Sequence, residues 1–221
     1  MKPEHWEKAK GADPLNIWHR WQPRLTPDGI PIIEEQEIAI PTRLIKYKDY
    51  RKYQTGDALH FFVDDYHYEH LWKSPTRYLP RLEGKTLLSP DFSLYADWPE
   101  PLQRFNLYRS RWLAAFWQHQ GMTVIPSLSW SDDTSYDWCF SGLPEGGIVA
   151  VSTAGCMGAR DAWTAGFEAM LDRLEPDRVL CYGNIRKIYT GRRLLHQVVP
   201  YFRLPLSYQG NAAIHERITS Y

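Results

Sequence analysis

The sequence lacks the cysteine patterns that build disulfide frameworks or structural metal centres. Its three cysteines, Cys139, Cys156 and Cys181, are widely spaced and odd in number. No C-x-x-C pair is present, so neither a structural zinc site nor an iron–sulfur cluster is expected. A scattered, odd set of cysteines is typical of a reducing compartment.

The chain also lacks net charge and long apolar runs. Its 26 Lys and Arg residues balance 26 Asp and Glu residues, so no overall charge draws it to nucleic acid or to an anionic membrane. No apolar run reaches the length of a membrane span, and the polar residues 1–10 do not resemble a signal peptide. We therefore expect a cytoplasmic protein with no membrane partner.

What the sequence has in quantity is aromatic side chains, which make up 14% of its 221 residues. Ten are Trp and fourteen are Tyr, and buried indole N–H and phenol groups need a polar partner. We expect some of these rings to line a hydrated groove. The length fits one domain. Residues 1–57 contain six scattered prolines and are predicted to form an irregular extension packed on a core of residues 58–221.

Short apolar runs alternate with amphipathic segments along the predicted core. Five runs predict buried strands at residues 58–63, 85–88, 122–126, 147–151 and 178–181. Two segments, 99–120 and 161–174, predict long helices, the first with a buried stripe formed by Leu102, Phe105, Tyr108, Trp112 and Phe116. This alternation predicts an α/β fold with a mainly parallel sheet of about five strands and helices on its faces, either doubly wound or a partial barrel.

Polar residues follow most of these predicted strands. Asp64 and Asp65 follow the first strand, and Ser89 and Asp91 follow the second. Parallel strands place their carboxyl ends at one edge, where open α/β folds and α/β barrels bind ligands. Asp64, Asp65 and Asp91 are therefore catalytic candidates, and Asp64 with Asp91 is a candidate site for Mg²⁺ or Mn²⁺. Ordinary capping of the following helix explains each single carboxylate equally well.

Other strand ends and the C-terminal part supply candidate binding residues. Asp132 lies in an acidic loop beside Trp130, whose ring could stack a base or a sugar, although a capped, solvated loop with a buried Trp accounts for the same residues. Tyr182 ends the last predicted strand. From Arg178 to His215 there is no acidic residue, and Arg192 and Arg193 lie among tyrosines. Such a basic strip is typical of a phosphate-binding surface, or of a face that balances acidic loops elsewhere.

The chain resembles an uncharacterised family, the domain of unknown function family 4417, which occurs in bacteria, their phages and mobile elements. The resemblance rests on motifs that run in order from about residue 58 to 184. They are FFVDDY at 61–66, SPDFSLY at 89–95, Asn106-x-Tyr108-Arg109, VIP at 124–126, Trp130-x-Asp132, YDWCF at 136–140, Gly155-Cys156 and Tyr182-Gly183. The resemblance implies a phage or mobile-element setting and marks six charged residues as parts of recurring motifs: Asp64, Asp65, Asp91, Arg109, Asp132 and Asp137.

Three functions remain open at this point. The first is an enzyme acting on a nucleotide or nucleic acid, with the three strand-end carboxylates as metal ligands or as acid and base, and with Arg109 holding a phosphate. The second is a non-catalytic nucleic-acid-binding accessory protein that uses the basic strip. The third is a protein-binding factor that inhibits or modifies a host system through its aromatic surface.

Overall fold

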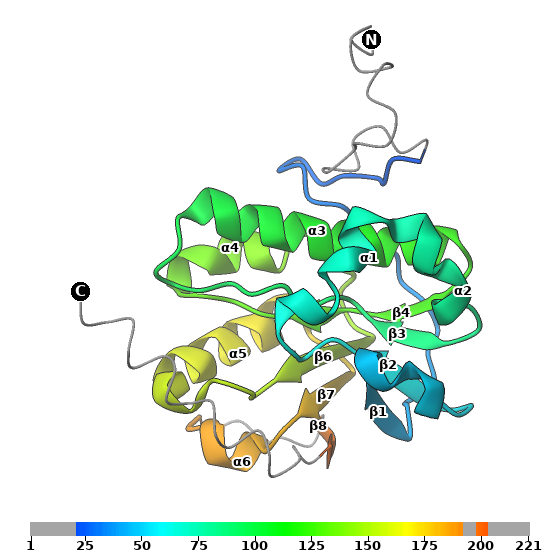
Figure 1. The fold of residues 1–221 in the computed structure, drawn as a ribbon. Coiled ribbons are helices and arrows are strands. Elements are labelled where there is room, and N and C mark those ends of the chain that lie inside the picture. The colour runs from blue at the N-terminus through cyan, green and yellow to red at the C-terminus, as the bar shows by residue number, and fades with distance from the viewer. Residues whose placement is uncertain (1–20, 192–197, 203–221) are drawn as a thin grey trace, which may run out of the picture.

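The computed structural model describes residues 21–191 and 198–202, and every strand in this part of the chain pairs in parallel with its neighbours (Figure 1). The strands form two four-stranded sheets in which spatial order follows chain order. The first sheet contains β1 (Arg43–Lys46), β2 (Asp57–His60), β3 (Thr86–Leu88) and β4 (Thr123–Ile125); the second contains β5 (Ser127–Leu128), β6 (Ile148–Ser152), β7 (Arg178–Tyr182) and β8 (Val198–Phe202).

Helical segments fill the connections between strands, as parallel pairing requires. The long helices are α3 (Glu100–His119) and α5 (Arg160–Leu174). The shorter α-helices are α1 (Glu69–Lys73), α2 (Leu79–Leu82), α4 (Tyr136–Cys139) and α6 (Ile185–Ile188). The 3-10 helices are η2 (Tyr47–Lys52), η3 (Asp65–His67), η4 (Pro75–Tyr78), η5 (Asp133–Ser135) and η6 (Met157–Ala159); η2 has six residues with a kink at Asp49, and the others are single turns.

The helices pack against only one face of the two sheets. Buried residues of α1 and α3 pack on Leu59, Leu87 and Val124 of the first sheet, and those of α4 and α5 pack on the same face of the second. The alternate strand residues form a separate core in which the two sheets meet each other. Among the described residues no helix takes part in this core, which contains Leu44, Ala58, Phe62 just after β2, Leu88, Ile125, Ala150, Leu180 and Tyr182. Strands in chain order with helices on the outside agree with the partial barrel, one of the two predicted arrangements.

The predicted α/β parallel fold is confirmed, and the structure adds strands that the pattern did not indicate. β1 lies inside the N-terminal extension that we expected to be irregular, and it pairs in register with β2. Two further strands were not predicted: β5 has only two residues, and β8 lies in the basic C-terminal segment. The predicted helix at 99–120 is α3, but Leu102 and Phe105 at its start are 53% and 36% exposed rather than buried.

The N-terminal segment 21–36 runs across the helices and binds residues far away in the chain. Ile33 N–H donates to the Gly142 carbonyl at 2.8 Å, and Glu34 and Gln36 bond Gln118 at the end of α3. Gly142 has a φ of +74°, and a Cβ there would lie 2.6 Å from the Pro31 carbonyl oxygen. Only glycine therefore allows the segment to pass this closely.

A glycine inside α5 provides a test of the packing between α5 and the loop after β5. A Cβ on Gly166 would lie 2.2 Å from Nε1 of Trp130, so Gly166→Ala forces the half-buried indole out of place. We expect a loss of about 1–3 kcal/mol, or a Tm lower by roughly 2–4 °C per kcal/mol, although alanine is the better helix former. The Tm can be measured by calorimetry or by circular dichroism.

Gly158→Ala is the matched control, because a Cβ on Gly158 meets no atom within 4 Å. Its Tm should stay within about 1 °C of wild type, since surface substitutions away from special features change stability little. Equal Tm values for the two variants would contradict the packing between Gly166 and Trp130.

Candidate functional site

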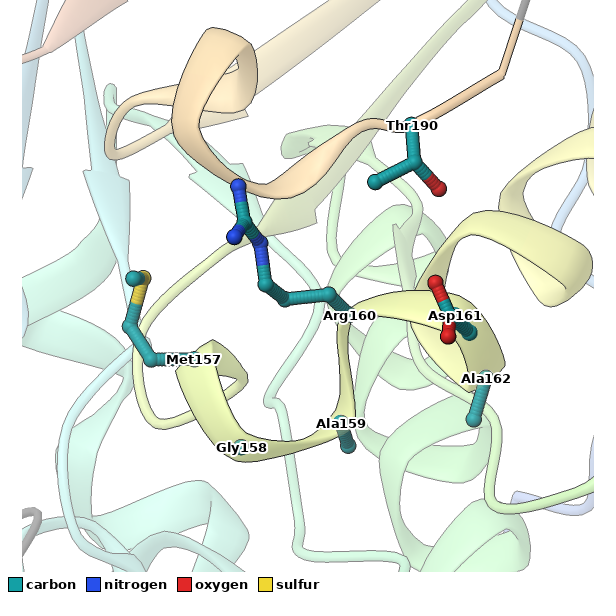
Figure 2. A pocket seen from close by; sticks show the side chains of 7 residues that line it. All are labelled: Met157, Gly158, Ala159, Arg160, Asp161, Ala162 and Thr190. Carbon is teal, nitrogen blue, oxygen red and sulfur yellow. The ribbon is translucent and has the colours of Figure 1, made fainter.

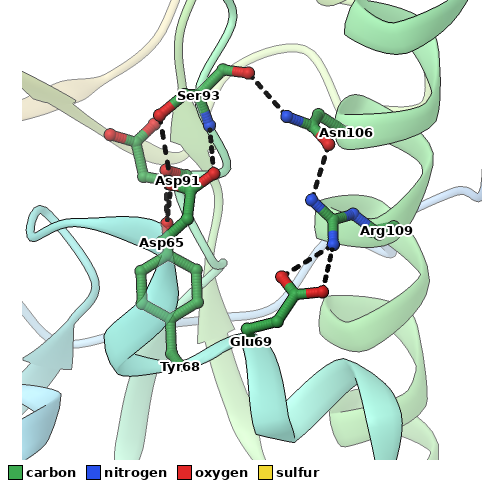
Figure 3. A network of polar contacts seen from close by, with 7 residues as sticks. All are labelled: Asp65, Tyr68, Glu69, Asp91, Ser93, Asn106 and Arg109. Atoms are coloured by element: carbon green, nitrogen blue, oxygen red, sulfur yellow. Dashed lines mark hydrogen bonds and ion pairs between the residues drawn. The ribbon is translucent and has the colours of Figure 1, made fainter.

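The candidate site lies at the carboxyl edge of the first sheet, where the loops after β2 and β3 meet the start of α3. Because all the described strands are parallel, the residues that follow β2 and β3 reach the same edge. The structure brings Asp65, the first residue of η3, next to the loop that contains Asp91 and Ser93 (Figure 3). The residue that lies next to the Asp91 loop is Asp65, and not Asp64, which the sequence paired with Asp91 as a metal site.

Asp65 is held by three hydrogen bonds from two residues. The Ser93 backbone N–H donates at 3.2 Å, the Ser93 hydroxyl donates at 3.1 Å, and the Tyr68 hydroxyl donates at 3.0 Å. Burial raises the pKa of Asp65, while these hydrogen bonds and the charge of Arg109 act in the opposite direction. Donated hydrogen bonds favour the ionised carboxylate, but burial outweighs them, and the pKa of Asp65 lies above its ordinary value.

Asp91 is the titratable group of the pair. Its carbonyl oxygen accepts a 2.5 Å hydrogen bond from the Tyr68 hydroxyl, which also contacts Asp65. Burial, and then the negative charge of Asp65, raise the pKa of the Asp91 carboxyl from 3.8 to about 7, against a hydrogen bond from Ser129 and the charge of Arg111. A carboxyl group of this pKa exchanges its proton near neutral pH, which is the property of a general acid or base.

Arg109 lies beside the site, and its positive charge is paired with the Glu69 carboxylate. Its guanidinium contacts both carboxylate oxygens of Glu69 at 2.9 and 2.8 Å and donates to the Asn106 side-chain oxygen at 2.6 Å. Asn106 in turn donates to the Ser93 carbonyl at 2.7 Å, as Figure 3 shows. The guanidinium also lies 3.9 Å from the ring centre of Phe92. Arg109 thus ties α1 and α3 to the Asp91 loop rather than facing an open space.

The other catalytic candidate from the sequence, Asp64, lies outside this network. It is exposed and precedes η3 without a side-chain capping bond. Two neighbouring aspartates follow the predicted strand, and the turn of η3 directs only the second toward Asp91.

The predicted binding residues occupy varied positions. Ser89 is fully buried, and its hydroxyl accepts a 2.7 Å hydrogen bond from the Ser127 N–H. Asp132 caps η5 by accepting from the N–H and hydroxyl of Thr134. Trp130 packs on Trp163, with ring centres 5.6 Å apart. Tyr182 lies in the core between the sheets, and Arg192 and Arg193 fall outside the described residues.

The sequence patterns did not indicate Arg111, a cation whose charge acts to lower the pKa of Asp91. Arg111 is 1% exposed, and its guanidinium donates to the carbonyls of Ser127 and Cys139 at 3.1 and 3.0 Å. Burial lowers its pKa to about 10, which leaves it charged at neutral pH. Arg111 lies within the predicted helix 99–120, next to Trp112 of its buried stripe. This position could have indicated a special role, since a buried Arg needs a structural or functional partner.

A second feature of the same edge is an open depression of about 510 Å³ at the start of α5, lined by residues 157–162 and Thr190 (Figure 2). Arg160 extends from the first turn of α5 and donates to the Lys187 carbonyl. Cys156, just before η6, lies close enough to Asp91 that its charge, after burial, helps to raise the thiol pKa to about 12. Cys156 therefore stays a protonated thiol, and the loop after β6 adjoins the Asp91 site.

The described residues contain neither a cluster of metal-ligating side chains nor a helix suited to crossing a membrane. Within residues 21–191 and 198–202, no three His, Cys, Asp or Glu side chains gather to form a possible metal site. No helix of those ranges combines the length and the apolar character needed to cross a membrane.

The raised pKa of Asp91 predicts a pH-dependent effect of Asp91→Asn on stability. The folded protein binds this proton more tightly than the unfolded chain does, because the folded-state pKa of about 7 exceeds 3.8. The resulting stability is fully present below about pH 4 and is lost as pH rises through 7. The neutral Asn avoids this loss, so we expect its Tm at pH 8 to exceed that of wild type by roughly 2–4 °C or more.

The gap between the two Tm values should close toward pH 4, and thermal melts at pH 4, 6 and 8 measure it. Asp64→Asn is the matched control, since it makes the same exchange one residue away from Asp65 at an exposed position. A gap for Asp91→Asn that does not change with pH would contradict the assigned pKa.

Comparison with known proteins places this site in a family context. Residues 23–200 match the family described as Domain of unknown function (DUF4417). The chain is 40% identical to the Gene 1 protein of Mycobacterium phage L5 over 190 residues, which cover 82% of each protein. It is 44% identical to the Gene 1 protein of Mycobacterium phage D29 over 136 residues, 60% of this chain and 50% of the phage protein. No solved structure matches the chain. The chain therefore belongs to the DUF4417 family.

Proposed function

We propose that this protein is an enzyme that acts on a phosphate-bearing substrate, a nucleotide or a nucleic acid, with Asp91 as the proton-transferring group. The observation that carries the proposal is the pair formed by Asp65 and Asp91, which follow neighbouring parallel strands and lie close enough for the charge of Asp65 to act on the Asp91 carboxyl. The Tyr68 hydroxyl contacts the Asp65 carboxylate and the backbone carbonyl of Asp91, which fixes the two loops together. Two carboxyl groups in unlike surroundings separate into one that stays ionised and one that carries a proton.

The unlike surroundings assign a role to each carboxyl group. Asp65 receives three hydrogen bonds and holds the negative charge. Asp91, with a pKa of about 7, gives its proton to the leaving oxygen of the substrate or, when ionised, accepts one from an attacking water. Arg109 then acts as a positioning residue, because it holds the loop through Asn106 and Ser93 rather than contacting the substrate.

The depression at the start of α5 supports a phosphate group on the substrate. The first backbone N–H groups of an α-helix have no intrahelical partner and attract anions, and α5 has 15 residues. Gly158 leaves open space in front of this end, because a Cβ there would touch nothing within 4 Å. Cys156, which precedes the depression, lies near enough to Asp91 for that carboxyl to affect its pKa, so in this proposal the substrate places its phosphate at α5 and its reacting bond at Asp91.

A divalent cation is compatible with this arrangement. Mg²⁺ commonly binds through one or two carboxylates together with substrate phosphates and water, so Asp65 and Asp91 would be sufficient protein ligands. In that variant of the proposal, Mg²⁺ or Mn²⁺ would lie between these carboxylates and the phosphate, taking the place that the sequence assigned to Asp64 with Asp91.

The matched pair Asp65→Asn and Asp64→Asn tests the assignment directly. Purified protein is assayed, with and without Mg²⁺ or Mn²⁺, against nucleoside triphosphates, a phosphodiester dye ester, and single- and double-stranded oligonucleotides. We expect turnover by wild type, a fall of about 10²–10⁴-fold for Asp91→Asn, and a comparable fall for Asp65→Asn. Asp64→Asn should keep wild-type turnover.

The pH profile provides an independent readout, because the wild-type rate should change slope near pH 7, where Asp91 titrates. Absence of turnover of every substrate class, with and without metal, would overturn the enzymatic proposal. Equal losses in Asp64→Asn and Asp65→Asn would overturn the assignment of the site.

A further inference from the structure

A surface rich in tyrosine and arginine covers the first two crossover connections, away from the carboxylate site. We call it the Tyr/Arg surface and define it by Tyr50, Arg51, Arg77, Tyr78 and Arg81, with Tyr53 and Lys85 beside them. These residues come from η2, from η4 with α2, and from the turns that follow. In Figure 1 this region lies around β1 and α2. Its residues come from two separate stretches of the chain, 50–53 and 77–85, which only the fold brings together.

The cationic side chains lie over tyrosine rings in a continuous series. Arg81 lies 5.7 Å from the ring centre of Tyr50 and 5.0 Å from that of Tyr78. Arg51 lies 5.6 Å from the Tyr50 ring centre, and Arg77 lies 5.8 Å from that of Tyr78. Each distance is within the range of a cation–π contact. Three guanidinium groups thus lie over two tyrosine rings on one surface.

The tyrosines are fixed from beneath, so the surface is preorganised. Tyr78 packs edge-on against His70, with ring centres 4.4 Å apart, and His70 hydrogen-bonds the buried Tyr47 hydroxyl at 3.0 Å. The Tyr53 hydroxyl accepts a 3.1 Å hydrogen bond from the N–H of Thr86, the first residue of β3. A ligand that binds rings held in this way loses less free energy to side-chain ordering.

The surface carries an excess of positive charge that carboxylates do not balance. Residues 47–53 and 73–85 contain seven basic residues, Lys48, Arg51, Lys52, Lys73, Arg77, Arg81 and Lys85, against the acidic Asp49 and Glu83. Asp49 pairs with Lys52 at 3.1 Å. Among the described residues, no carboxylate forms an ion pair with Arg51, Arg77 or Arg81, and all three are exposed. This charge is therefore available to an anionic partner.

We propose that the Tyr/Arg surface binds single-stranded nucleic acid. The three guanidinium planes are exposed and lie over half-buried tyrosine rings. Such planes stack unpaired bases, and the surrounding Lys and Arg residues neutralise phosphates. Arginine stands at each of the three positions in contact with Tyr50 or Tyr78, and arginine, unlike lysine, presents a planar group for stacking. In duplex nucleic acid the bases are already stacked on each other and cannot use these planes.

The surface and the proposed active site are independent. None of the residues that define the Tyr/Arg surface takes part in the Asp65–Asp91 network, and binding requires no proton transfer. Asp91→Asn should therefore bind single strands as wild type does, so loss of catalysis and loss of binding can be measured separately.

The experiment is fluorescence anisotropy on the full chain with labelled single-stranded DNA and RNA of about 12 nucleotides, within the range of known single-strand sites. The double variant Arg77→Ala/Arg81→Ala should bind at least about tenfold more weakly. Its log–log salt dependence should flatten by about 1.4, from two lost contacts at roughly 0.7 each. Arg77→Lys/Arg81→Lys should keep the wild-type salt dependence and still lose affinity, because charge remains while the stacking plane is lost.

Arg173→Ala/Arg178→Ala is the matched control, since it removes two exposed arginines from α5 and β7. It should bind single strands as wild type does, and circular dichroism melts should show all variants folded. No binding of single strands at low salt, an equal loss in the control, full affinity in the lysine variant, or tighter binding of duplex or of a polyglutamate peptide would each overturn the proposal.

Discussion

The buried guanidinium of Arg111 is the interaction on which the two halves of the fold and the candidate site both depend. The chain passes from the first sheet to the second at Pro126, between β4 and β5, and Arg111 bonds the carbonyls of Ser127 and Cys139 just beyond that point. A buried cation costs free energy unless it is paired and hydrogen-bonded. Its charge also opposes the rise in the pKa of Asp91. The same side chain therefore joins the sheets and limits how strongly Asp91 holds its proton.

The network around Asp65 shows why a charged residue near a site need not act on a substrate. Arg109 is only 8% exposed and bonds Glu69 and Asn106, so moving it toward a phosphate would leave Glu69 without its partner. Breaking such a largely buried pair is more costly than forming a new contact with a solvated anion. Asp91, by contrast, is adjusted by burial and by neighbouring charges, and this adjustment makes it the chemically active member of the group.

Periodic patterns predicted the long elements of this fold well. The apolar spacing along 99–120 and the prolines at its start indicated α3 within one residue at each end, because a long amphipathic helix repeats its signal over several turns. β1 escaped notice because Arg43–Lys46 contains only two aliphatic residues between charged ones, and its pairing with β2 comes from tertiary contacts. The two residues of β5 contain too little pattern for any prediction.

The candidate site was predictable in location and less so in its members. Parallel strands bring their carboxyl ends together, so the meeting of the β2 and β3 loops followed from the fold class alone. The choice between Asp64 and Asp65 depends on the turn of η3, and the contribution of Tyr68 and Ser93 depends on loop conformations that no periodicity describes. The role of Arg109 differed from expectation because Glu69, the first residue of α1, neutralises it.

The position of residues 21–36 has a consequence for how the protein is made. Glu34 and Gln36 bond residues 84 to 88 positions later in the chain, and Ile33 bonds Gly142. At a synthesis rate of about 5–20 residues per second, the segment is made roughly 4–22 s before these partners exist. During that interval Trp21 has no aromatic partners, since it packs on Trp112 and Phe116 of α3. Residues 21–36 can therefore reach their place only after α3, β4 and the loop of Gly142 have been translated, later than the strands β1, β2 and β3 that follow them in the chain.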